Sequence, residues 1–185
     1  MVARPPLRLK VEPMTLEDVD AVHRIERASF PLPWPEYAFR QELQTNRLAH
    51  YLVLRASGEA VGYGGLWMMV DEAHITTIAV LPQWRRHSVG GRLLLEMMRL
   101  ARELGARVMT LEVRLSNGPA RALYQRFGFH PVGIRPRYYS DNGEDALIMT
   151  TEALATPQMA ARFAELEQRY TGEAPDAGQG TEEPA

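Results

Sequence analysis

A strand-like stretch that runs directly into an amphipathic helix restricts this chain to a fold in which sheet and helix pack together. The apolar residues up to Val80 have the composition of a strand, and from Gly90 to Gly105 the apolar residues recur at helical spacing. The junction between them reads QWRRHSVGG. A simple turn does not need two arginines, a serine and two glycines together, so the junction is also a candidate binding site.

The rest of the chain alternates between strand and helix patterns. Thr15 and Asp18 resemble a capping box, and Met14 with Val19 occupies the positions of a hydrophobic staple. The predicted strands are residues 7–13, three stretches of an antiparallel meander within 50–80, 107–114, and two closing strands, 129–141 and 144–154, joined by a tight hairpin at Asn142 and Gly143. The predicted helices are 14–30, 35–44, 90–104, 117–127 and 157–170.

Length and composition predict one α/β working domain. The chain has 185 residues, of which 45% are hydrophobic, and we place its domain at 1–154, a helical extension at 155–170 and a disordered tail at 171–185. A formal charge of -2 provides no general attraction for polyanions, so we expect no direct nucleic-acid partner. The sequence lacks a membrane-length apolar run and a signal peptide's apolar core, which favours a cytoplasmic protein without a membrane partner.

Metal and thiol chemistry find no support in the sequence. The chain contains no cysteine, which excludes disulfides, a thiol nucleophile and cysteine-ligated metals. Its five histidines are scattered without HExxH spacing, so we interpret each as a surface or packing residue and predict no metal.

The junction before residue 90 is suited to an anion. The first amides of a helix have no backbone partner and lie at the positive end of its dipole. Ser88, Gly90 and Gly91 would let several N–H groups converge on a diphosphate, with Arg85 and Arg86 adding charge. A serine cap with solvated arginines explains the same residues equally well. No Walker loop or full GxGxxG is present.

The next predicted strand favours the functional interpretation. Glu112 interrupts the apolar run VMTLEV, which predicts a partly desolvated carboxylate with its pKa raised toward that of a general base. A salt bridge with Arg114, or an edge position facing water, is the alternative. Tyr124 shares a helical face with Ala120 and Phe127, and simple packing explains it as well as a chemical role does.

Three segments together resemble the acetyl-CoA-dependent GNAT N-acetyltransferases. They read IAVLPQWRRHSVGGRLL, LEVRLSNGPARALYQRFGF and RPRYYSDNGEDALIM. They are most similar to the RimI-type ribosomal-protein alanine N-acetyltransferases and their archaeal N-terminal acetyltransferase relatives, over roughly residues 7–154. The resemblance implies an α/β (α+β) GNAT fold: a mixed, mostly antiparallel, twisted sheet of about seven strands flanked by about four helices, plus a C-terminal helix and disordered tail.

The resemblance also implies where acetyl-CoA binds. Its diphosphate would lie on amides between Arg86 and Gly91, and its pantetheine arm would pair with the strand ending at Val80, where an amide would serve as the oxyanion donor. The implied cofactor-binding residues are Ile78, Ala79, Val80, Arg86, His87, Ser88, Val89, Gly90, Gly91 and Asn117.

Two side chains carry the implied chemistry. Glu112 would take a proton from the acceptor's ammonium group, directly or through water, because only a neutral amine attacks the acetyl carbonyl. Tyr124 would protonate the departing coenzyme A thiolate. Direct transfer needs no acetyl-enzyme, in agreement with the lack of cysteine.

The implied acceptor is the N-terminal α-amino group of a protein, and the closest resemblance suggests a ribosomal protein that begins with alanine. Trp34, in the FPLPW loop, and Tyr138 and Tyr139 would flank the peptide's entry, although they are equally expected to pack loops over the sheet. The alternatives are transfer to a lysine side chain or small amine, and a non-catalytic acetyl-CoA-binding module.

One residue departs from the family pattern, which usually has glycine at the position of Ser88. Serine at a helix's first turn normally needs no positive φ, so we expect the loop to function, with cofactor binding either weakened by the side chain or assisted by its hydroxyl.

Overall fold

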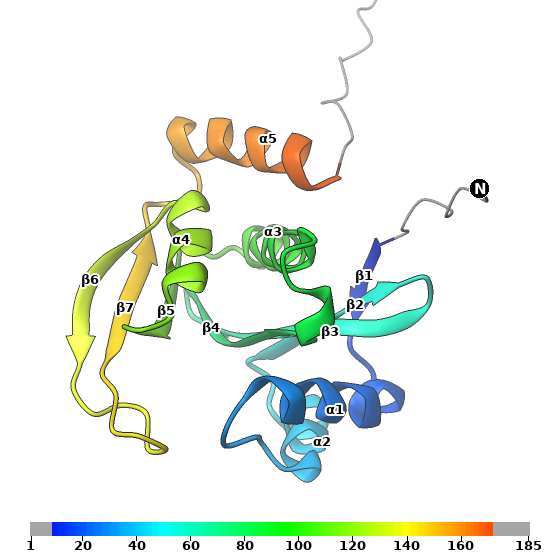
Figure 1. The fold of residues 1–185 in the computed structure, drawn as a ribbon. Helices are drawn as coiled ribbons and strands as arrows, with labels where there is room; N and C mark the ends of the chain where they lie inside the picture. The colour runs from blue at the N-terminus through cyan, green and yellow to red at the C-terminus, as the bar shows by residue number, and fades with distance from the viewer. Residues whose placement is uncertain (1–8, 172–185) are drawn as a thin grey trace, which may run out of the picture.

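Seven strands lie side by side in one mixed sheet in the order β1-β2-β3-β4-β5-β7-β6 (Figure 1). The computed structural model describes residues 9–171. The strands are β1 Leu9–Pro13, β2 Ala49–Ala56, β3 Glu59–Met69, β4 Glu72–Val80, β5 Val108–Arg114, β6 Phe129–Arg135 and β7 Ala146–Thr151. All neighbours are antiparallel except β4 and β5, which are parallel. The expected α/β class and mixed, mostly antiparallel sheet are confirmed.

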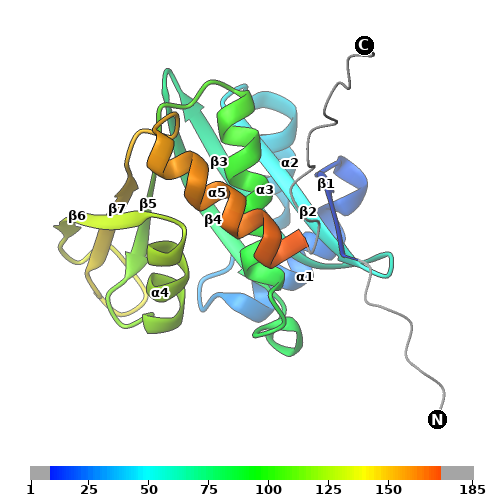
Figure 2. The ribbon, with the colours of Figure 1, turned by 90° about the horizontal axis from the view of Figure 1, so that it is seen from above.

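Helices cover both faces of this sheet. They are α1 Val19–Ser29, α2 Glu36–Thr45, α3 Val89–Glu103, α4 Gly118–Arg126 and α5 Pro157–Thr171, with short 3-10 helices at Leu16–Asp18 and Pro82–Trp84. Figure 1 shows α1 and α2 on one face and α3 and α4 on the other. Figure 2, viewed from above, shows α5 crossing over α3 as an outer layer. The tail expected at 171–185 lies, from residue 172, outside the described residues.

Helix ends follow the expected signals with one exception. The Thr15 amide donates to Oδ2 of Asp18 at 2.9 Å, as the capping box predicts. Gly105 and Gly128 follow α3 and α4 with φ of 86° and 91°, a conformation that glycine adopts without steric cost. Pro35 precedes α2 as its N-cap instead of forming its first residue.

Two apolar clusters hold the helices to the sheet. Beneath α3, the residues Leu93, Leu94, Met97 and Met98 have at most 1% of their surface exposed and pack against the sheet. On the opposite face, Val19, Val22 and Ile25 of α1 lie in a second cluster. Burial of each such side chain contributes roughly 1.5–3 kcal/mol. The sheet is therefore anchored on both faces.

The connection between β6 and β7 differs from the expected tight hairpin. The strands stop at Arg135 and Ala146, so a ten-residue loop, 136–145, joins them. Pro136 lacks an amide hydrogen and cannot continue the ladder, which ends the strand earlier than its apolar pattern indicates. Within the loop, the Gly143 amide donates to the Tyr139 carbonyl at 2.7 Å. Asn142 and Gly143 do form a turn, but this turn lies inside the ten-residue loop and does not join the two strands directly.

Candidate active site

The parallel strands β4 and β5 separate along their length. They pair over Glu72–Ile75 with Val108–Leu111, and no register pair joins the residues beyond. Residues 77–80 of β4 are paired with β3, Thr76 falls at a register shift, and residues 112–114 of β5 are paired with β7. The facing edges of these segments therefore have unpaired backbone donors and acceptors under α3 and α4 (Figure 1). We call these two diverging strand edges the slot.

The turn that leads from β4 into α3 has an unusual backbone. Arg86 and Ser88 adopt left-handed conformations with φ of 64° and 62°. The expectation that Ser88 needs no positive φ is therefore wrong: it is the N-cap of α3 and its φ is left-handed. Turns that contain left-handed residues can direct successive amides toward a common point and form an anion-binding concavity. Such strain costs about 1–2 kcal/mol for a residue with a Cβ and is typical of functional sites.

Side chains of the turn have separate tasks. Arg85 donates from Nε to the Val80 carbonyl at 3.1 Å and so ties the turn to the end of β4. The His87 ring contacts the Arg85 carbonyl through Nδ1 at 2.8 Å, and Arg86 is exposed. Val89 is buried in the core, so only its backbone is available to a ligand.

The two glycines of the junction face different surroundings. A Cβ added at Gly90 would lie 3.8 Å from Leu123 of α4 and 3.9 Å from Val80 of β4, so this position faces the region where α3, α4 and β4 meet. A Cβ at Gly91 would overlap the ring of Tyr170 in α5. Gly90 thus belongs to the surroundings of the slot, whereas Gly91 lies beneath the C-terminal helix.

Helix α4 contributes the next two candidate residues. Asn117 caps the helix, since its side chain accepts a hydrogen bond from the Ala120 amide at 3.2 Å. Tyr124 is 6% exposed, and its ring packs edge-on against Phe129 with centroids 5.8 Å apart. Burial, and after it the neighbouring Tyr139, raise the pKa of the Tyr124 hydroxyl. The hydroxyl therefore keeps its proton at neutral pH.

Glu112 lies at the point where β5 leaves β4. Its side chain is 6% exposed, and its two oxygens contact different partners: Nε2 of His74 lies 2.8 Å from Oε2, and Nε of Arg135 lies 3.1 Å from Oε1. The hydrogen bond from His74 lowers the pKa of Glu112; burial acts in the opposite direction, and the charge of Arg135 adds to the lowering. The expected raised pKa is therefore wrong, and the alternative of a salt bridge with Arg114 is not found in the part of the chain that the structure describes, because the ionic partners of Glu112 are His74 and Arg135.

The loop between β6 and β7 brings two aromatic residues to the same region. Tyr138 and Tyr139 pack edge-on with centroids 5.2 Å apart, and the Glu112 charge contributes to a raised pKa in both, after the larger effect of burial. Arg114 holds the loop: its guanidinium lies 3.8 Å from the Tyr139 ring centroid and contacts both oxygens of Asp141 at 2.9 Å. Tyr138 remains 46% exposed and available for contact.

Trp34 lies in the loop between α1 and α2. Its amide donates to Oε1 of Glu26 at 2.9 Å, and the same buried carboxylate accepts the hydroxyl of Tyr63 on β3. The indole is 37% exposed and its ring centroid lies 5.9 Å from that of Phe39. The contact with Phe39 accounts for the packed side of the Trp34 ring, and the other side of the ring is exposed to solvent.

Tyr139 links the candidate residues, because it lies within electrostatic reach of Glu112, Tyr124 and Tyr138. No hydrogen bond or ring contact within the described residues links Trp34 to this group. Sequence reasoning missed His74 and Arg135. A signal for His74 existed: if strands 72–80 and 108–114 are paired in parallel, His74 lies opposite Thr110 and therefore on the same face as Glu112.

Other binding features are few. Within residues 9–171, no group of three or more His, Cys, Asp or Glu side chains could hold a metal ion. Over the same residues, no helix has the length and apolar character needed to cross a membrane. Two open hollows border α5 and are lined mainly by polar side chains, among them Arg162 and Glu165. Both hollows lie away from the slot.

Comparison with known proteins agrees with this geometry. The sequence model of the GNAT acetyltransferase family matches residues 19–129. A Bacillus subtilis protein, provisionally described as a ribosomal protein bS18-alanine N-acetyltransferase, is 50% identical over 139 residues, which cover 75% of this chain and 92% of that protein. An N-alpha-acetyltransferase of Sulfurisphaera tokodaii is 37% identical over 147 residues, covering 72% of this chain and 87% of its own.

A solved structure matches as well. The crystal structure of the ribosomal-protein alanine N-acetyltransferase from Escherichia coli superposes with a TM-score of 0.73 at 29% sequence identity. The match covers 81% of this chain and 97% of that one.

Proposed function

The chain belongs to the GNAT acetyltransferase family, and on that premise we propose that it transfers the acetyl group of acetyl-CoA to the N-terminal α-amino group of a ribosomal protein beginning with alanine. The observation that carries the proposal is the position of Glu112. It is a buried carboxylate with a lowered pKa at the point where β4 and β5 part. An ionised carboxylate beside the unpaired strand edges supports a role as the base that receives a proton from the acceptor's ammonium group.

The residues around the slot fit acetyl-CoA. Amides of the left-handed turn at Arg86 and Ser88 suit its diphosphate. A Cβ at Gly90 would be in ordinary van der Waals contact with Leu123 and Val80, so the glycine leaves a gap of about the size of that Cβ beside the first turn of α3.

Within residues 9–171, the edge of Ile78, Ala79 and Val80 that faces β5 has no strand partner, and only the Val80 carbonyl on it is engaged, by Arg85. This edge can therefore form strand-like hydrogen bonds with the extended pantetheine arm. Asn117, with Oδ1 already engaged in capping, has its amide nitrogen available as a donor.

Separate groups of the protein serve as the base, the oxyanion donor and the acid of the proposed transfer. Acetyl-CoA would supply an acetyl group already activated as a thioester. Glu112, fixed by His74, accepts a proton from the acceptor's ammonium group, directly or through water, and leaves a neutral amine. An amide on the free edge of β4 donates to the oxygen that becomes negative. The amine nitrogen forms a bond to the acetyl carbon, the C–S bond breaks, and Tyr124, whose hydroxyl holds its proton at neutral pH, donates that proton to the departing sulfur. The second proton lost by the nitrogen passes through water to restore the Tyr124 hydroxyl.

The acceptor peptide would enter between two aromatic loops. Trp34 lies in the loop after α1, while Tyr138 and Tyr139 lie in the loop after β6. Arg114 and Glu26 hold these loops and would keep the aromatic walls in position. Relatives described as ribosomal-protein alanine N-acetyltransferases support a ribosomal acceptor, which also implies work in the cytoplasm.

Mass spectrometry of a peptide panel tests the proposal. The panel contains peptides with a free N-terminal alanine, the same peptides with a blocked N-terminus and an internal lysine, and small amines, each incubated with acetyl-CoA. We expect acetylation of the free N-termini, and a loss of about 10²- to 10⁴-fold in rate for Glu112→Gln. Acetylation of lysine or small amines without acetylation of N-termini would contradict the proposed acceptor.

A further inference from the structure

Helix α5 lies outside the residues matched by the family model, which ends at residue 129, and rests on the helices that border the slot. It packs on the side of α3 that faces away from the sheet (Figure 2). Oε1 of Glu167 accepts from Nε and a terminal nitrogen of Arg99 at 3.2 and 2.8 Å, and the Arg102 guanidinium lies 4.6 Å from the Phe163 ring centroid. The C-terminal extension is therefore firmly docked on α3.

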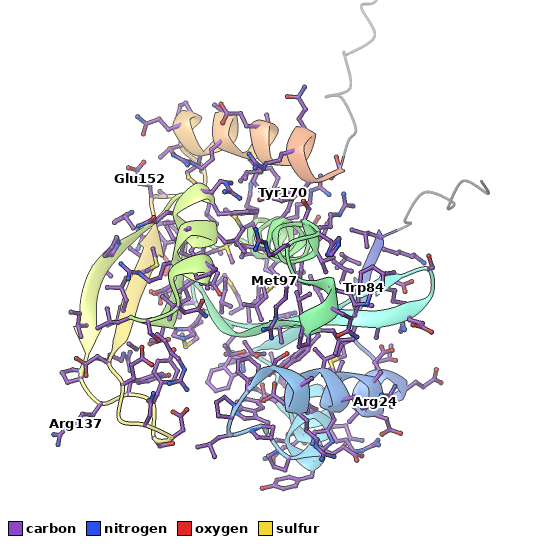
Figure 3. All side chains as sticks on the ribbon, in the orientation of Figure 1. Arg24, Trp84, Met97, Arg137, Glu152 and Tyr170 are labelled. Atoms are coloured by element: carbon purple, nitrogen blue, oxygen red, sulfur yellow. The ribbon has the colours of Figure 1, made fainter. Side chains whose placement is uncertain are left out.

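The last turn of α5 touches both helices of the candidate active site. Figure 3 shows Tyr170 pointing from α5 toward α3. Its ring covers Gly91, in the first turn of α3, and stacks at a tilt against Phe127, with centroids 5.5 Å apart. Its hydroxyl accepts a hydrogen bond from Arg126, the last residue of α4, at 3.1 Å. One side chain thus joins the start of α3 to the end of α4.

This contact explains why the junction has two glycines in a row. Consecutive helical residues point about 100° apart, so adjacent glycines face different surfaces. Gly90 faces Val80 and Leu123 near the slot, whereas any side chain at position 91 would collide with Tyr170. The second glycine is therefore matched to the C-terminal helix and is not required by the approach of a phosphate.

We propose that Tyr170 is a positioning residue for the acetyl-CoA site, which fixes the first turn of α3 against α4 from the side opposite the slot. The proposal rests on the function proposed above. The first turn of α3 presents the amides for the diphosphate, and α4 carries Asn117 and Tyr124. A tie between the two helices sets the spacing of groups that bind different parts of one ligand.

A double-mutant cycle on the full chain, read by calorimetric titration with acetyl-CoA, tests this coupling. Tyr170→Ala should raise the Kd about three- to tenfold, as expected for a coupling residue that does not touch the ligand. Tyr170→Phe keeps the ring, so its Kd for acetyl-CoA should stay within about twofold of that of the unchanged chain. Gly91→Ala places a methyl group against the Tyr170 ring and should weaken acetyl-CoA binding. The double variant Gly91→Ala/Tyr170→Ala lacks that ring, so it should bind acetyl-CoA more tightly than Gly91→Ala alone.

Phe163→Ala is the control that separates a specific effect of Tyr170 on acetyl-CoA binding from a general loss of α5 packing. It removes a buried contact of α5 near the far end of α3, so it should lower the melting temperature while leaving the Kd for acetyl-CoA unchanged. In steady-state assays, Tyr170→Ala should raise the KM for acetyl-CoA and leave the KM for the peptide unaltered.

Three outcomes would overturn the inference. One is an unchanged Kd in Tyr170→Ala, and another is the same Kd in Gly91→Ala with and without the second substitution. The third is a rise in Kd for Phe163→Ala as large as that for Tyr170→Ala, which would indicate a general effect of losing α5. An unchanged chain that binds no acetyl-CoA would instead refute the proposed function, and the inference with it.

Discussion

His74 and Glu112 face each other across the two strands whose edges form the slot, with Nε2 of His74 lying 2.8 Å from Oε2 of Glu112. A carboxylate only accepts hydrogen bonds, so the proton of this contact lies on the imidazole. The contact fixes the orientation of the carboxylate and lowers its pKa, even though the side chain is only 6% exposed. The base of the proposed reaction is therefore ionised in the resting enzyme.

The first prediction concerns pH. A carboxyl group with a pKa below its ordinary value of about 4.3 is fully ionised above pH 6. The proposed step starts from ionised Glu112 and the ammonium form of the acceptor. Between about pH 6 and 9, kcat/KM should therefore stay level and then fall with a single inflection near the pKa of the acceptor amine, about 7.7–8.0 for an α-amino group. Measurement with two peptides of different amine pKa checks this, because the inflection should move with the peptide.

The second prediction removes the histidine. In His74→Leu the lowering contact is lost while burial remains, so the pKa of Glu112 rises and the carboxyl group becomes protonated as the pH falls toward the acid end of the assay. We expect activity below about pH 6 to fall in this variant and not in the unchanged chain. His130→Leu, on the exposed edge strand β6, is the matched control. Identical profiles for all three proteins would contradict the assigned role of His74.

The third prediction tests the proton donor. Tyr124→Phe keeps the ring that packs on Phe129 and removes only the hydroxyl, so folding should be preserved. We expect kcat to fall about 10²-fold, the lower end for loss of a general acid, with the Kd for acetyl-CoA unchanged. Single-turnover rates together with calorimetric Kd values separate the two effects. An unaltered kcat would mean that the thiolate leaves without this proton.

Local sequence signals predicted most of the fold because they act over a few residues. Thr15 and Asp18 cap a helix three residues apart, and Gly105 and Gly128 end helices by adopting a positive φ. The order of the strand pattern predicted the meander β2–β4. These features need no knowledge of which distant segments meet.

The partners of charged residues could not be predicted in the same way. Glu112 and Arg114 are two positions apart on one strand, and roughly 6.6 Å of backbone separates them. His74 lies opposite Thr110, so it is a diagonal neighbour of Glu112, at a spacing of about 7–8 Å that two long side chains can bridge. Backbone spacing alone therefore does not choose between His74 and Arg114 as the partner of Glu112. The lowered pKa of Glu112 follows from the strand register, which the sequence does not contain. The left-handed Ser88 is likewise imposed by the path from β4 into α3.

The fourth prediction concerns that serine. Ser88→Gly removes about 1–2 kcal/mol of backbone strain and adds about 0.4–1 kcal/mol of entropy to the unfolded chain. We expect a stability gain of at most about 1.5 kcal/mol and an acetyl-CoA affinity gain below tenfold. Ser57→Gly is a matched control, because Ser57 is also left-handed, at φ 51°, but lies in the turn between β2 and β3. It should gain stability without gaining affinity. A gain of several orders of magnitude in Ser88→Gly would mean that the natural turn is damaged.

The last prediction concerns how the acceptor loop is held. The Arg114 guanidinium stacks on Tyr139 and contacts both oxygens of Asp141, and a lysine ammonium can do neither with the same geometry. In Arg114→Lys the loop between β6 and β7 should lose its fixed position, so the KM for the peptide should rise about tenfold while the KM for acetyl-CoA stays unchanged. Arg107→Lys is the matched control, since Arg107 pairs with Asp71 at 2.8 Å on an exposed surface far along the chain from this loop. Steady-state kinetics with each substrate varied in turn distinguish the two variants. If Arg114→Lys raised the KM for acetyl-CoA instead, Arg114 would serve the cofactor site, and the loop after β6 would not be the wall that receives the acceptor.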